Sequence, residues 1–313
     1  MKVIDLINSS KSTAFSFEIL PPLKGNSIQK VYNVIDKLIE FDPKYINITS
    51  HHSEYIYKTL PDGSFQKINI RKRPGSVAIA SAIQNKYGIT AVPHIICKGF
   101  TKDETEYALI DLNFLGVYDL LLLRGDVKTL EAGQKTDIYH EHATDLQQQV
   151  NDFNKGIAID GSAFEANETP FSYGMACYPE KHEEAPNMDS DIFYLKEKVK
   201  NGADYLVTQM FFDNEKYYAF VDRCRAEGIT VPIIPGIKPI VFKNQLTVLP
   251  KIFRSDIPEP FATELRKCKT DDEAKAVGVE WCIQQCKDLI AHGVPSLHFY
   301  TMMASDSVYK VAK

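Results

Sequence analysis

The chain has 313 residues, with 36 Lys and Arg against 41 Asp and Glu, which gives a formal net charge of −5. Apolar residues make up 44% and charged residues 25%, a balance that is typical of folded globular proteins and argues against disorder. Because the chain is slightly acidic and has no long Lys/Arg run, we expect no nucleic-acid partner. No apolar run approaches the roughly 18 residues of a membrane span, and Asp5 and Asn8 interrupt the segment where a secretory signal would be apolar. We therefore expect a soluble, cytoplasmic protein with no membrane partner.

The six cysteines form no Cys-x-x-Cys pair. They are Cys97, Cys177, Cys224, Cys268, Cys282 and Cys286. Their spacing disfavours a disulfide framework and a zinc site, so we expect reduced thiols. The His-x-His pair of His140 and His142 lies in or before a helical pattern and not on a strand, so we expect no metal.

Short runs rich in β-branched and aromatic residues alternate eight times with amphipathic stretches of about 12 residues. The runs cover residues 14–20, 45–49, 90–97, 119–123, 171–178, 205–212, 232–237 and 296–301. Several are apolar at consecutive positions, as expected for strands that are buried on both faces of a parallel sheet. A doubly wound sheet is disfavoured because no two glycines stand two apart, which excludes its Gly-x-Gly-x-x-Gly loop. The pattern predicts an α/β protein with a single (β/α)8 TIM-type barrel over residues 1–313 and no regulatory domain.

The helical patterns between these runs begin at polar residues, and three of them end at glycine. We expect starts at Ser27, Asp191, Asn214 and Thr270, and stops at Gly202, Gly228 and Gly293. Two segments break the regular spacing. Residues 53–72 carry a Pro61-Asp62-Gly63 turn between alternating flanks, which predicts a β-hairpin insertion after the second strand. Residues 155–169 are polar and predict a loop insertion before the fifth strand.

Polar residues stand at or just beyond the carboxyl ends of the predicted strands, where (β/α)8 barrels place their chemistry. In chain order they include Glu18, Thr49, His94, Arg124, Gly125, Asp126, Tyr178, His182, Gln209, Lys238, His298 and Tyr300. Glu18 interrupts an apolar run, so its carboxyl must find a partner in the barrel or line the mouth. A desolvated carboxyl tends toward a raised pKa and can hold a proton to donate, which favours an acid–base role for Glu18.

Each of these residues also has a purely structural interpretation. Arg124 and Asp126 fit an ion pair that closes a loop, and Gln209 fits a bridge between buried backbone groups. His94 and His298 fit core histidines whose nitrogens are satisfied by neighbours. The residues by themselves leave both interpretations open.

Short motifs, taken together, resemble the 5,10-methylenetetrahydrofolate reductases. They are Ser16-Phe17-Glu18 with Pro21-Pro22, Pro93-His94, Leu123-Arg124-Gly125-Asp126, Tyr178-Pro179-Glu180-x-His182, Thr208-Gln209-x-Phe211-Phe212-Asp213, Pro235-Gly236-Ile237 and His298-Phe299-Tyr300-Thr301. No single motif is specific to that family. Seven motifs that occur in the order of that family, one per strand, are a specific signal. The chain resembles the bacterial catalytic barrel of the family.

The resemblance implies a barrel that binds FAD and reduces 5,10-methylenetetrahydrofolate to 5-methyltetrahydrofolate with NADH or NADPH. The two substrates would use the flavin in turn, in a ping-pong scheme, and the product would supply methyl groups for methionine synthesis. The implied partners are therefore a folate and a nicotinamide nucleotide, with further copies of the chain in a homo-oligomer.

By the same resemblance, Glu18 is the general acid that opens the five-membered ring of the folate, and Asp126 is a carboxylate beside the flavin pyrimidine. The substrate-binding positions are Gln209, Phe242 and Tyr300. The cofactor-binding positions are Thr49, His94, Arg124, Gly125, Asp126, Ala143, Tyr178, His182, Ala185, Asp191 and Lys198.

The chain departs from the family pattern at several points. An Arg that commonly meets folate after the last strand is missing near Ala304, so the glutamate tail is expected to be held by Lys238 or by a residue of the hairpin insertion. Glu197 replaces a basic residue of the FAD-phosphate site. Either Tyr139 or His142 matches the residue that packs on the cofactor.

Two other functions remain open. One is a metal-independent lyase or transferase that uses Glu18 and Asp126 as acid and base without a flavin. The other is a flavin- or folate-binding barrel without turnover. A preparation that cannot be loaded with FAD would favour the first alternative, and flavin binding without turnover would favour the second.

Overall fold

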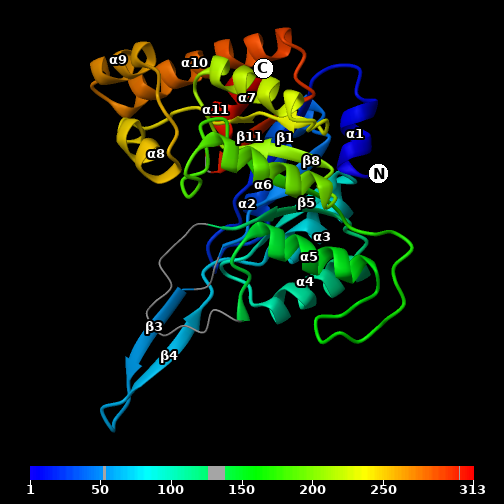
Figure 1. The fold of residues 1–313 in the computed structure, drawn as a ribbon. Coiled ribbons are helices and arrows are strands. Elements are labelled where there is room, and N and C mark those ends of the chain that lie inside the picture. The colour runs from blue at the N-terminus through cyan, green and yellow to red at the C-terminus, as the bar shows by residue number, and fades with distance from the viewer. Residues whose placement is uncertain (52–53, 126–137, 303) are drawn as a thin grey trace.

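The computed structural model describes residues 1–51, 54–125, 138–302 and 304–313 (Figure 1). Among these described residues, nine parallel strands form one sheet in the order β10-β11-β1-β2-β5-β6-β7-β8-β9. They are β1 (Ala14–Ile19), β2 (Tyr45–Ile48), β5 (Thr90–Ile96), β6 (Asp119–Leu123), β7 (Ser172–Cys177), β8 (Tyr205–Thr208), β9 (Ile233–Ile234), β10 (Gly236–Ile237) and β11 (Ser296–Met302). The two short strands at the ends of this order, β9 and β10, are consecutive in the chain and separated by Pro235, which has no N–H to donate. They form one interrupted barrel strand that pairs with β8 on one side and β11 on the other, and so closes the barrel.

One helix follows each strand of the barrel on its outer side, which confirms the predicted (β/α)8 fold. These helices are α2 (Gln29–Leu38), α3 (Ser76–Tyr87), α4 (Lys102–Phe114), α5 (Ala143–Asn154), α6 (Met188–Lys200), α7 (Asn214–Ala226), α10 (Asp271–Ala291) and α11 (Ser305–Ala312). In the described part of the chain, four further helical segments lie outside that repeat: α1 (Val3–Ser9), η1 (Ile39–Phe41), α8 (Gln245–Phe253) and α9 (Glu259–Lys267). Among the described residues, no helix is long and apolar enough to cross a membrane.

Side-chain caps set several of the helix starts. The Thr270 hydroxyl accepts from the Glu273 N–H and the Asp213 carboxylate accepts from the Glu215 N–H, which confirms the starts expected there. The start expected at Asp191 is wrong by three residues. The Asn187 side chain accepts from the Ser190 N–H, so α6 begins at Met188 and Asp191 lies in its first turn.

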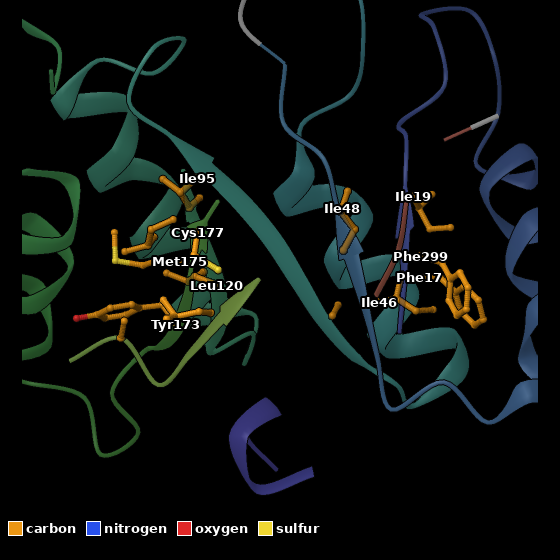
Figure 2. Packing of buried hydrophobic residues seen from close by; sticks show 14 of the residues in the cluster. Phe17, Ile19, Ile46, Ile48, Ile95, Leu120, Tyr173, Met175, Cys177 and Phe299 are labelled. Carbon is orange, nitrogen blue, oxygen red and sulfur yellow. The ribbon is translucent and has the colours of Figure 1, made fainter. Parts of the chain in front are cut away.

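The strands alternate between two buried environments because successive side chains point to opposite faces. Phe17 of β1, Ile46 of β2 and Phe299 of β11 belong to the apolar layer between strands and helices, and the rings of Phe17 and Phe299 stack 5.5 Å apart (Figure 2). The alternate positions belong to the barrel interior. Tyr45 and Tyr205 fill its lower part, toward the amino ends of the strands.

Helix α1 closes the amino end of the barrel. Val3 and Ile7 are buried against the interior cluster, and the Val3 N–H donates to Asp119 Oδ1 at 2.8 Å. Asp119 is itself buried, and burial raises the pKa of its carboxyl to about 6, although the Val3 N–H and the nearby terminal ammonium oppose that rise. The interior is therefore closed and mostly apolar toward the amino ends of the strands, and the polar residues of the site lie toward the carboxyl ends.

Two segments project from the regular repeat. Strands β3 (Glu54–Thr59) and β4 (Phe65–Ile70) form an antiparallel hairpin that extends away from the barrel (Figure 1). Residues 155–169 form a loop whose one regular pairing is an isolated bridge between Ile157 and Ala163. All six cysteines lie within the described residues and are buried and free.

The raised pKa of Asp119 predicts a pH-dependent stability. A carboxyl whose folded pKa exceeds its unfolded value of about 3.9 lowers the free energy of unfolding as pH rises through about 4 to 6. Asp119→Asn keeps an oxygen for the Val3 N–H but removes the charge. We expect this variant to match the parent near pH 4 and to exceed its free energy of unfolding by about 2–3 kcal/mol at pH 8. Urea unfolding at both pH values measures this.

The matched control is Asp111→Asn, which removes an exposed carboxylate from α4. It should leave the pH dependence of the parent unchanged. If Asp119→Asn and the parent lose stability in parallel between pH 4 and pH 8, the pKa assigned to Asp119 is wrong.

Candidate active site

A cavity of about 550 Å³ lies at the carboxyl ends of the barrel strands. Nine of the residues singled out from the sequence line it: Glu18, Thr49, His94, Arg124, Gly125, Tyr178, His182, Gln209 and Tyr300. They come from β1, β2, β5, β6, β7, β8 and β11, or from the residues just after these strands, so closure of the sheet gathers them at one end. Parallel strands place all their carboxyl ends at the same edge, which is why residues far apart in sequence meet here.

Glu18 stands at the centre of a buried polar cluster. Its Oε2 lies 3.7 Å from His94 Nε2 of β5 and 3.7 Å from His298 Nε2 of β11. The Ser16 hydroxyl lies 2.9 Å from His298 Nδ1. Because Ser16 and Glu18 are two apart on β1, both point into the barrel, and the register of β1 on β11 sets Ser16 opposite His298. The carboxylate and both imidazoles are nearly inaccessible to water.

The direction of the Glu18 pKa differs from the expectation drawn from burial alone. Burial raises it, but His298, the charge of His94 and the ammonium of Lys238 together outweigh burial and hold the pKa below its ordinary value. Burial also lowers the pKa of His94 to about 4, against the opposing effect of Glu18, so that imidazole is neutral at pH 7. The sequence located the carboxyl, but it gave no sign that two imidazoles and a buried ammonium lie around it.

Lys238 lies behind this cluster, directly after β10. Its side chain is buried, and its Nζ contacts the Met302 sulfur at 3.4 Å. Burial lowers the pKa of the ammonium, and the charge of Glu18 opposes that effect. Within the described ranges of the chain, no carboxylate oxygen lies within 4.0 Å of this ammonium.

A second charged group lies at the mouth of the cavity. Arg124, which follows β6, pairs with Glu184 and lies 3.5 Å from Glu183, and Arg254 lies 3.7 Å from Glu183. The Arg124 side chain is only 13% exposed, so its positive charge is held largely out of water. This is a ready partner for an anionic group.

Two of the predicted cofactor-binding residues, Asp191 and Lys198, support the wall of the cavity. Asp191 accepts from the His182 N–H at 2.7 Å, and the rings of Tyr178 and His182 meet edge to face with centroids 4.7 Å apart. Lys198 Nζ donates to the Ala176 carbonyl at 2.9 Å. Asp191 and Lys198 therefore orient wall residues in this structure.

The structure does not bring the other predicted residues to the cavity. Ala143 begins α5, Ala185 donates its N–H to the His182 carbonyl, and Phe242 is 52% exposed. None of these three is among the residues that line the cavity. Asp126 lies outside the described residues.

Some lining residues were not found from the sequence. Ser50 and His51 follow β2, Lys181 and Glu183 follow β7, and Met302 ends β11. The carboxyl end of α8, with Ile252, Phe253 and Arg254, adds a wall from outside the strand–helix repeat. No motif marks these positions, and α8 reaches the cavity through packing of a helix that the repeat does not predict.

The arrangement is suited to acid–base chemistry on a ligand held at the mouth. A buried carboxylate faces two imidazoles and a lysine, and an arginine lies at the rim. Among the residues that the structure places, no group of three or more His, Cys, Asp or Glu side chains could hold a metal ion.

Comparison with known proteins identifies the family. A family model described as Methylenetetrahydrofolate reductase matches residues 2–313. The 5,10-methylenetetrahydrofolate reductase of Escherichia coli (strain K12) is 30% identical over 297 residues, which cover 95% of this chain and 88% of that protein. The probable methylenetetrahydrofolate reductase (NADPH) of Caenorhabditis elegans is 30% identical over 313 residues, covering 99% of this chain and 43% of that protein. The chain thus spans less than half the length of the nematode relative.

A solved structure supports the same fold. It is described as an uncharacterized protein from Clostridium thermocellum that binds two copies of 5-methyl-5,6,7,8-tetrahydrofolic acid. The TM-score is 0.58 at 16% sequence identity, with 99% of this chain and 97% of that chain covered, so the likeness concerns the fold. Because the family model spans all but the first residue, the resemblance seen in the motifs is confirmed, and the chain belongs to the methylenetetrahydrofolate reductase family.

Proposed function

We propose that this protein reduces 5,10-methylenetetrahydrofolate to 5-methyltetrahydrofolate with electrons from NADH or NADPH, carried by a bound FAD. The observation that carries the proposal is the buried Glu18 carboxyl at the closed end of a cavity in a barrel of this family. Relatives whose names specify NADH or NADPH support a nicotinamide donor.

The residues around the cavity fit the proposed flavin. Arg124 offers a guanidinium to a phosphate, in place of the carboxylates of Glu183 and Glu184 that it contacts now. The Thr49 hydroxyl and the His94 ring line the same cavity, and His94 Nε2 has no hydrogen-bond partner among the described residues. When bound, FAD supplies the two-electron chemistry: it accepts a hydride from the nicotinamide and delivers one to the folate.

Glu18 acts on the folate. In its protonated form the carboxyl donates to the folate nitrogen whose bond to the one-carbon unit breaks, and the five-membered ring opens. The carbon left outside the ring is then electron-poor and ready for reduction. His94 and His298, 3.7 Å from the carboxylate, exclude water and hold the carboxyl in place.

Gln209 and Tyr300 line the cavity and are the proposed substrate contacts. Gln209 Oε1 accepts from the Met210 N–H, which leaves its amide N–H₂ for a ligand. The Tyr300 hydroxyl donates to the Thr208 carbonyl, so this ring is fixed and offers a rigid surface.

The roles of Asp126 beside the flavin and of Phe242 against the substrate stay predictions. A homo-oligomeric state, a cytoplasmic location, a single-domain organisation and a role in methionine synthesis stay predictions as well.

Replacement of the proposed acid should separate the two half-reactions. In Glu18→Gln we expect FAD content and reduction by NAD(P)H to stay near the parent values, because the amide keeps the size of the side chain. Reoxidation by 5,10-methylenetetrahydrofolate should slow by roughly 10²–10⁴, the usual range for a lost general acid. Stopped-flow absorbance of the flavin measures both steps.

The control for this experiment is Glu280→Gln on the outer face of α10, where the carboxylate is exposed. It should leave both steps unchanged. Equal slowing of both steps in Glu18→Gln would contradict an acid role for Glu18 and point to a disturbed cofactor site.

The lowered pKa of Glu18 predicts a pH dependence for the folate step. Above that pKa the protonated fraction grows about tenfold for each unit by which pH falls. The rate of reoxidation by the folate should therefore rise as pH is lowered from 8 to 6, while reduction by NAD(P)H changes little. Stopped-flow rates at several pH values measure this, with Glu18→Gln as the variant whose folate step should lose the dependence. A folate step that is flat or faster at high pH in the parent would rule out Glu18 as the proton donor.

A further inference from the structure

We propose that Lys238 is a positioning residue whose buried ammonium is a permanent countercharge of Glu18 and lowers the proton affinity of the general acid. The inference rests on the proposed function, because it assigns a further residue to the same acid–base site. The three observations that carry it concern the register of the strands, the burial of the side chain and the lack of a closer anionic partner.

The register places Lys238 beside Glu18. Strand β1 pairs with β11 so that Glu18 lies opposite Tyr300. Strand β10 pairs with the other edge of β11, with Gly236 opposite His298 and Ile237 opposite Phe299. Lys238 is the next residue after Ile237, so the same register sets it level with Tyr300 of β11. Glu18 of β1 is paired with Tyr300, so Lys238 and Glu18 lie at the same level on the two sides of β11.

The side chain of Lys238 is directed inward by the alternation along its strand. A Cβ built on Gly236 would lie 2.3 Å from the Thr208 carbonyl oxygen and 2.6 Å from the Tyr300 ring, so that position faces the crowded interior and only glycine fits there. Lys238 is two residues further along the chain and shares this direction. Its contact with the Met302 sulfur, which lines the cavity, places the ammonium at the same end of the barrel as Glu18.

The ammonium has no other strong partner in the described part of the chain. A thioether sulfur is a weak hydrogen-bond acceptor, and a buried ammonium is costly unless an anion faces it. The charged and titratable groups around the pair are His94 of β5, His298 and Tyr300 of β11, and Cys282 of α10. Glu18 is the member of this set that carries a negative charge at neutral pH.

Lys238 differs from His94 as a countercharge. His94 is neutral at pH 7 because its pKa is about 4. The ordinary pKa of lysine is about 10.4, so the ammonium tolerates a considerable lowering before it loses its proton at neutral pH. Lys238 therefore favours the ionised form of Glu18 in the resting site, so the carboxyl takes a proton from solvent before it donates that proton to the folate nitrogen.

The test is a direct titration of the Glu18 carboxyl. Difference infrared spectroscopy across a pH series reports the carboxyl stretch of Glu18, which is assigned by its loss in Glu18→Gln. An opposite charge within about 4–6 Å lowers a carboxyl pKa by about 1–3 units. In Lys238→Met, which keeps the length of the side chain without its charge, the Glu18 pKa should rise by about one unit or more. In Lys238→Arg, which keeps the charge, it should stay near the parent value.

The control is Lys287→Met, which removes the same charge from the exposed face of α10 and should leave the Glu18 pKa unchanged. Circular dichroism and flavin content establish that each variant is folded. An unchanged Glu18 pKa in folded Lys238→Met would overturn the proposal, as would an equal rise in Lys238→Arg or Lys287→Met. If Lys238→Met does not fold, the Arg variant decides: a Glu18 pKa near the parent value supports the proposal, and a rise of a unit overturns it.

The infrared titration needs no substrate, so its outcome is separate from that of the proposed function. A kinetic readout is added for the holoenzyme. The pH at which reoxidation by 5,10-methylenetetrahydrofolate begins to slow should be higher in Lys238→Met, by the same number of pH units as the rise in the Glu18 pKa. The pH profile for reduction by NAD(P)H should stay unchanged. If the Glu18 pKa rises in Lys238→Met and the parent protein does not reduce the folate, the role of Lys238 as countercharge of Glu18 is supported and the proposed function is contradicted.

Discussion

A carboxylate taken out of water inside a protein must be compensated by neighbouring charge or it gives up its charge. Glu18 meets this constraint in a barrel whose lower interior is apolar and closed by α1, so no bulk water reaches it from below. The compensation comes from β5, β11 and the residue after β10, which are distant in sequence and adjacent across the closed sheet. Closure of the barrel is therefore a chemical requirement of the site as well as a structural one.

Successive side chains along each strand point to opposite faces, so residues that pack against the helices alternate with residues that point into the barrel. Phe17, Ile46 and Phe299 point outward and bind the strands to their helices, and such apolar positions provide most of the stability. Ser16, Glu18 and His298 point inward, where they form part of the buried polar cluster around the Glu18 carboxylate. The two sets share the same strands, so a change of one residue in register would place the carboxyl among apolar helices.

The barrel could be predicted because each strand has a local signature and each helix that was predicted well has a local cap. The start of α6 was misplaced because Asn187 competes with Asp191 as a cap, and propensity alone does not rank them. The helices α8 and α9 follow no repeat, so the wall around Arg254 required the tertiary structure. Nine residues that line the cavity could be predicted because strand ends are visible in sequence. The lowered pKa of Glu18 depends instead on the imidazoles and the ammonium that the closed sheet gathers around it. Phe242 is exposed and does not line the cavity, so its role against the substrate stays a prediction.

The central claim is that one cavity performs two half-reactions through a bound flavin, with Glu18 serving the second. An anaerobic titration of the purified, FAD-loaded protein tests it most directly, with the visible flavin absorbance followed throughout. NADH or NADPH is added first, and 5,10-methylenetetrahydrofolate follows. The account predicts bleaching of the flavin on the first addition and recovery of the oxidised spectrum on the second, with 5-methyltetrahydrofolate as product. Bleaching without recovery, or a protein that cannot be loaded with FAD, would contradict it.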